Sequence, residues 1–110
     1  WVSHMRNAGF QAVVIQITDL RATKDKFGVM PELRACHTAV IDGFVIEGHV
    51  PAREVIRLLK DRPKATGLAV PGMPIGSPGM EQGGRQDPFQ VFLFSSTFRQ
   101  IFAEYPLQQI

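Results

Sequence analysis

Ala39-Val40-Ile41-Asp42-Gly43-Phe44-Val45-Ile46, residues 39–46, is the stretch that decides the fold. Two short apolar runs flank an Asp-Gly pair, a pattern typical of a tight hairpin turn with positive φ at both central positions. The sequence therefore predicts two antiparallel strands, His37–Ile41 and Phe44–Val50, joined by that turn.

A helix is predicted directly after the hairpin. Apolar residues recur there at the helical spacing of i, i+3, i+4 and i+7: Ala52, Val55, Ile56 and Leu59. Pro51 stands where a missing backbone N–H has no cost, at the start of the helix. The helix is expected to end before Pro63, because the residue that precedes a proline avoids helical geometry.

The N-terminal part predicts two further helices and a strand. Trp1–Ala8 has the pattern of the last turns of a helix, with Gly9 as its C-terminal stop. Phe10–Thr18 is an apolar, β-branched run, which favours a strand covered on both faces. Asp19 is a candidate N-cap for a helix that continues to about Phe27 and ends at Gly28.

The C-terminal part predicts a long loop and two strands. Lys64–Pro88 is rich in glycine and proline and is expected to be irregular, although its apolar residues indicate that it packs against the domain. Phe89–Phe94 is predicted to be a strand. Thr97–Tyr105 is predicted to be a partner strand, a C-terminal β extension, with a short helix as the alternative.

This order predicts an α/β fold with a thioredoxin-like sheet and flanking helices. One additional strand in front would complete the thioredoxin-type order β-α-β-α-β-β-α. In such folds the first strand lies in the centre of the sheet, between the second and the third. Without it, inner backbone N–H and C=O groups lack partners, and each buried group costs about 1–3 kcal/mol. We therefore expect residues 1–110 to be one domain that is incomplete at its N-terminus, or a chain to which a partner protein contributes the strand.

Composition limits the possible function classes. The chain has 110 residues, with 45% hydrophobic and 20% charged residues, which fits one globular domain. Its net charge of +2 (12 Lys and Arg against 10 Asp and Glu) is weak evidence for a nucleic-acid partner, and we expect none. A single cysteine excludes an internal disulfide framework and an all-cysteine metal site within one chain. No apolar run is long enough to span a membrane, and no signal peptide is visible.

Two long blocks of sequence resemble a known family. They are Cys36-His37-Thr38-Ala39-Val40-Ile41-Asp42-Gly43-Phe44-Val45-Ile46-Glu47-Gly48-His49-Val50-Pro51 and Gly67-Leu68-Ala69-Val70-Pro71-Gly72-Met73-Pro74-Ile75-Gly76-Ser77-Pro78-Gly79-Met80. The chain resembles the CopG-type copper-resistance family from Trp1 to about Phe94. The resemblance implies a thioredoxin-like fold, export to the periplasm and binding of copper through thiolates.

The resemblance also implies a metal site that this sequence holds only in part. The family carries a CxCC-type motif at the start of the first helix and a distal cysteine, which Cys36 matches. The CxCC motif would lie before Trp1 and is absent from these residues. Copper, as Cu(I) or Cu(II), is therefore expected as a cofactor only where upstream cysteines are present.

The candidate metal ligands each have a functional and a structural interpretation. A thiolate at Cys36 would select Cu(I), whereas a free cysteine is also a common buried packing residue. His37, at the start of a strand, is expected to point away from Cys36 and to serve a structural or supporting role more readily than ligation. His49 could cap the following helix, bond a loop carbonyl or ligate metal. Met73 and Met80 could ligate Cu(I) or anchor the loop to the core.

Other polar residues are given structural roles. His4 is expected to be solvated, Asp42 to be a turn residue and Glu47 to face solvent. Trp1 is expected to shield the metal site or to pack. No Ser/His/Asp order or pair of carboxylates stands out, so hydrolysis has no support and the chain is not expected to be an enzyme.

Three functions remain open. The first is a copper-binding protein that buffers, carries or changes the redox state of copper. The second is a non-catalytic accessory subunit of a larger complex, for which the missing strand and the aromatic tail (Phe98, Phe102 and Tyr105) argue. The third, resting on the fold alone, is a thiol oxidoreductase, which would need upstream cysteines spaced CxxC.

Overall fold

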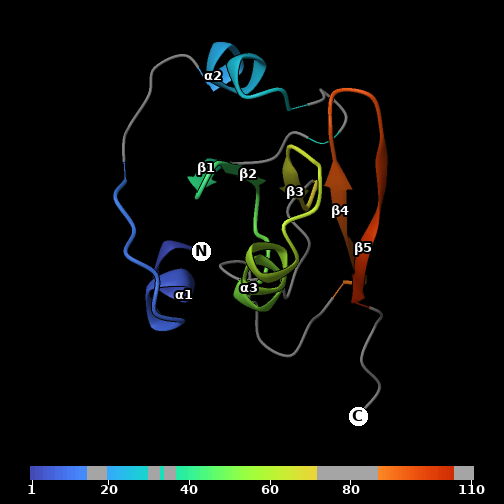
Figure 1. Cartoon of the computed structure of the whole chain (residues 1–110). Helices are drawn as coiled ribbons and strands as arrows, with labels where there is room; N and C mark the ends of the chain where they lie inside the picture. The colour runs from blue at the N-terminus through green and yellow to red at the C-terminus, as the bar shows by residue number, and fades with distance from the viewer. Residues whose placement is uncertain (15–19, 30–32, 34–36, 72–86, 106–110) are drawn as a thin grey trace.

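The computed structural model describes residues 1–14, 20–29, 33, 37–71 and 87–105 (Figure 1). In chain order, its elements are α1 (Val2–Asn7), α2 (Leu20–Lys26), β1 (Thr38–Ile41), β2 (Phe44–Glu47), α3 (Ala52–Asp61), β3 (Gly67–Ala69), β4 (Phe89–Phe94) and β5 (Arg99–Tyr105). The strands of this part of the chain form a mixed sheet in the order β1-β2-β3-β4-β5. The predicted α/β class is confirmed.

The hairpin of β1 and β2 forms as predicted. The two strands are antiparallel, with Ile41 opposite Phe44. Asp42 and Gly43 have φ values of 51° and 87°, the left-handed geometry that the two-residue turn requires. β2 is shorter than predicted, because Gly48 adopts a φ of 79° and turns the chain toward α3.

Helix α3 carries the chain from β2 to β3, which pairs with β2 in parallel. The loop predicted for Lys64–Pro88 is therefore wrong at Gly67–Ala69, whereas residues 72–86 lie outside the described part. The glycine that suggested a loop is instead required by the sheet, since a Cβ on Gly67 would lie 1.6 Å from the Val45 carbonyl oxygen. A hairpin followed by a helix is compatible with the predicted thioredoxin-like core.

The sheet carries a hydrophobic core on each face, because successive strand side chains point to opposite sides. Figure 1 shows α1 and α3 on one side and α2 on the other. Residues of the α1 and α3 side include Met5, Phe44, Ile46, Val55, Leu58, Leu68, Val91 and Leu93. Those of the second core are Val29, Leu33, Val45, Ala69 and Phe94.

The N-terminal helices are confirmed, but the strand expected between them is not. Gly9 and Gly28 take positive φ values of 98° and 76° just after α1 and α2. Residues 10–14 form no strand, and Val13 and Val14 are 86% and 62% exposed. Among the described residues no strand lies beside this segment to pair with its backbone. The rest of the prediction, residues 15–18, lies outside the described part.

The two C-terminal strands are confirmed. β4 pairs with β3 on one side and with β5 on the other, antiparallel in both cases. The register of β4 and β5 shifts between Val91 and Phe92, a β-bulge that bends the pair. β5 closes the sheet at the end opposite to β1.

Candidate metal centre

The start of α1 lies against the residue that precedes β1. The ring of Trp1, at the N-cap of α1, is 4.8 Å from the ring of His37, measured between centroids. The indole Nε1 of Trp1 also donates a hydrogen bond of 2.7 Å to the carbonyl of Val50. Trp1 is thus held between the residue that precedes β1 and the connection from β2 to α3.

His37 packs against a second imidazole, that of His49. The two rings meet edge to face with their centroids 5.0 Å apart, and His49 is only 7% exposed. The backbone carbonyl of His37 accepts a hydrogen bond of 2.9 Å from the N–H of Gly48. The Nε2 atom of His37 is buried and has no hydrogen-bond partner among the described residues.

The environment keeps the His37 imidazole neutral. Burial lowers its pKa to about 4, with further lowering by His49 and Lys24, while a hydrogen bond with the Gly48 backbone opposes the shift. A neutral imidazole can ligate a metal ion without first losing a proton. β1 begins only at Thr38, so His37 precedes the strand, and the predicted alternation with Cys36 does not fix its direction.

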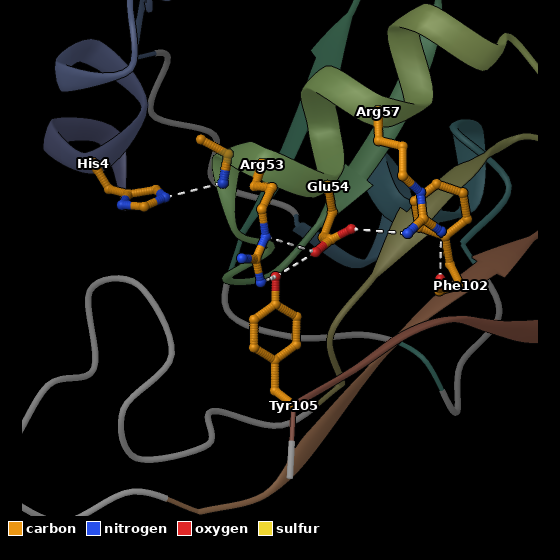
Figure 2. A network of polar contacts seen from close by, with 7 residues as sticks. His4, Arg53, Glu54, Arg57, Phe102 and Tyr105 are labelled. Carbon is orange, nitrogen blue, oxygen red and sulfur yellow. Dashed lines mark hydrogen bonds and ion pairs between the residues drawn. The ribbon is translucent and has the colours of Figure 1, made fainter. Parts of the chain in front are cut away.

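His4 makes a contact that the sequence pattern missed. Its Nε2 accepts a hydrogen bond of 3.0 Å from the backbone N–H of Ala52, the first residue of α3 (Figure 2). The expectation that His4 is solvated is therefore wrong. The first N–H groups of a helix have no partners within the helix, and α1 brings an acceptor to one of them. No feature of the sequence around His4 indicates this long-range contact.

Comparisons with known proteins identify the family of this chain. A family model described as "Protein of unknown function, DUF411" matches residues 33–80. Two solved structures, titled "Copper resistance protein copG" in Form 1 and Form 2, are each 44% identical to this chain. This chain belongs to the CopG-type family. The two structures match 96% of it with a TM-score of 0.91, and the match covers 85% and 86% of their own chains. A search of curated proteins found no match.

In this CopG-type chain the structure brings together only part of the predicted metal set. Cys36, Met73 and Met80 lie outside the described residues, while His37 and His49 are in ring contact. Within the described ranges, no group of three or more His, Cys, Asp or Glu residues could hold a metal ion. The same residues include no helix long and apolar enough to cross a membrane.

On the opposite face of the sheet, Glu47 is buried in an ion pair. Its carboxylate lies 2.6 Å from the Nζ of Lys24 on α2, and the two side chains are 0% and 6% exposed. Lys24 Nζ also donates to the hydroxyl of Thr38, at 2.9 Å. The prediction that Glu47 faces solvent is wrong, because β2 is covered on both faces and α2 supplies the counter-charge.

The aromatic tail of this chain is engaged by its own helix α3 rather than left free for a partner. Figure 2 shows the carboxylate of Glu54 accepting a hydrogen bond from the hydroxyl of Tyr105 and meeting the guanidinium groups of Arg53 and Arg57. The Arg57 guanidinium lies 3.7 Å from the centroid of the Phe102 ring. These contacts fasten β5 to α3.

Proposed function

We propose that this protein binds copper and serves in copper resistance, as a carrier or buffer of Cu(I). The observation that carries the proposal is the 44% identity, over 96% of the chain, to proteins titled copper resistance protein. Cys36 provides one thiolate, and soft thiolate ligands favour Cu(I). The other thiolates come from the CxCC-type motif that the family resemblance implies before Trp1.

The contact between Trp1 and His37 supports this site. Cys36 is the neighbour of His37 in sequence. The ring centroids of Trp1 and His37 are 4.8 Å apart. Sulfur ligands immediately before Trp1 would therefore lie close to His37, the residue that follows Cys36 in the sequence. Met73 and Met80 are candidates for additional thioether ligands. The protein would act in the periplasm, as the family resemblance implies.

The test is the Cu(I) affinity of the natural-length protein, measured by competition with a chromophoric chelator. The wild type should bind Cu(I), and Cys36→Ser should lower the affinity by at least about tenfold, the scale at which disturbed metal sites lose affinity. Met73→Leu and Met80→Leu separate thioether ligation from loop packing, because leucine retains the apolar volume. A natural-length protein that binds no Cu(I) contradicts the proposal.

One observation favours a second function, that of an accessory subunit whose sheet is extended by a strand from a partner protein. β1 pairs only with β2 in the described part of the chain, and Val40 in its centre is 51% exposed. Val13 and Val14 add further exposed apolar surface. An open, uncharged edge strand is a site at which another strand can pair. Purification as a lone monomer with full thermal stability would contradict this function.

A further inference from the structure

Helix α1 is fastened to the connection between β2 and α3 by two hydrogen bonds. The indole Nε1 of Trp1 donates to the carbonyl of Val50, at 2.7 Å, and the backbone N–H of Ala52 donates to the imidazole Nε2 of His4, at 3.0 Å. Met5, also on α1, is 1% exposed and belongs to the core on this side of the sheet. α1 therefore docks through one apolar side chain, one contact in which it donates and one in which it accepts.

The hydrogen bond of His4 requires a neutral imidazole. Ala52 is the first residue of α3, so its N–H has no acceptor within the helix. A neutral imidazole has one acceptor nitrogen and one N–H, and since Nε2 accepts, the proton is on Nδ1. Protonation would turn Nε2 into a second donor that faces an N–H. It would also place a positive charge at the positive end of the dipole of α3.

The charged groups around this contact do not offset a positive charge on His4. Glu54, the acidic residue in the first turn of α3, already accepts from the hydroxyl of Tyr105 and lies in ion pairs with two arginines (Figure 2). The segments that meet here are α1, the residue before β1, the connection from β2 to α3 and the first turn of α3. Their other charged or titratable side chains are basic: Arg6, His37, His49 and Arg53. A protonated His4 would therefore add a like charge to this group.

We propose that the hydrogen bond between His4 and Ala52 is a pH-sensitive latch, which holds α1 against α3 near neutral pH and releases it in acid. Histidine side chains ordinarily titrate near a pH of about 6.5, and protonation competes with this hydrogen bond. The unfolded state then binds the proton more readily than the folded state. The contribution of the latch to stability is therefore complete above a pH of about 6.5 and is lost as the pH falls below it. The latch is separate from the proposed copper function.

The experiment compares the natural-length wild type with His4→Gln and Ser3→Gln by urea unfolding, at about pH 7.5 and about pH 5.5, on either side of the ordinary histidine range. Glutamine keeps an uncharged acceptor at position 4. Ser3 is an exposed residue of the same helix, so Ser3→Gln is the matched control that retains His4. All three proteins retain His37 and His49, whose contributions therefore cancel.

Acid should destabilise the wild type more than His4→Gln. We expect the unfolding equilibrium constant of the wild type, relative to that of His4→Gln, to rise by about threefold to tenfold between the two pH values, tenfold being the limit for one histidine that is protonated only when unfolded. Ser3→Gln should follow the wild type. A smaller relative rise, or a rise that Ser3→Gln abolishes as well, would overturn the inference.

A second measurement keeps the inference testable if His4→Gln does not fold. Nitrogen-15 NMR of the wild-type histidine rings at neutral pH should show His4 protonated at Nδ1 and unprotonated at Nε2. The signal of the Trp1 indole N–H should shift together with the titration of His4, because both side chains hold α1 to the same connection. A His4 ring protonated at Nε2, or one that titrates without any shift at Trp1, would overturn the inference and leave the copper function untouched.

Discussion

Replacing Glu47 with alanine should leave the buried ammonium group of Lys24 without its counter-charge. The two side chains are 0% and 6% exposed and their charged atoms are 2.6 Å apart, so water cannot take the place of the missing carboxylate. Breaking such a buried pair costs about 3–5 kcal/mol. Because domains of this size are stable by about 5–15 kcal/mol, the variant should be close to unfolding.

A double variant removes both charges of the pair, and with them the cost of burying each charge away from water. Lys24→Met with Glu47→Leu removes both charges and retains apolar volume, and such replacements are often neutral or even stabilising. We therefore expect the double variant to be more stable than Lys24→Met or Glu47→Leu alone.

The assay is urea unfolding followed by far-UV circular dichroism and by the fluorescence of Trp1, with equal m-values required for the comparison. Single variants that cost about 1 kcal/mol or less, as exposed ion pairs do, would refute the reasoning. A double variant whose loss equals the sum of the losses of Lys24→Met and Glu47→Leu would also refute it, because additivity means that the two charges do not interact.

Three further predictions concern Gly67, His4 and Tyr105. Gly67→Ala should prevent β3 from pairing with β2 and leave little folded protein, whereas Gly43→Ala, which meets no atom within 4 Å, should cost only about 1–2 kcal/mol for its positive φ; solubility and urea unfolding compare them. His4→Ala should lose the acceptor for the first N–H of α3 and about 1 kcal/mol, measured as a lowered Tm, and an unchanged Tm would contradict the contact. Tyr105, the only tyrosine, should titrate above its usual pKa of 10.0, because burial and the hydrogen bond to Glu54 raise it, and Glu54→Gln should lower that pKa in an absorbance titration. Since the unfolded state ionises first, stability should fall as pH rises above 10 toward the folded pKa, and a normal pKa for Tyr105 would refute the prediction.

Local signals predicted the elements whose geometry is set by neighbouring residues. The turn at Asp42 and Gly43 needs positive φ at two adjacent positions, and few residue pairs supply it. The apolar repeat within Ala52–Asp61 could bury one face only as a helix. β4 and β5 were likewise predicted from their own composition.

Residues whose state depends on distant parts of the chain were not predicted. Glu47 is buried because α2 brings Lys24 to it, and His4 is half-buried because it accepts a hydrogen bond from the first N–H of α3. Gly67 lies in a strand, and its position must be a glycine because β2 approaches too closely for any side chain. None of these partners can be identified from the residues next to them in sequence.

The candidate site, too, could be predicted from the sequence only in part. By itself, the sequence determined which side chains could bind copper, because thiolate, imidazole and thioether chemistry belongs to the residue types and their resemblance to the CopG-type family. The tertiary structure decided which of them can act together, since only folding places Trp1 against His37 and the carbonyl of Gly48 against its ring. The burial of the His37 Nε2 atom follows from such contacts, which join segments far apart along the chain.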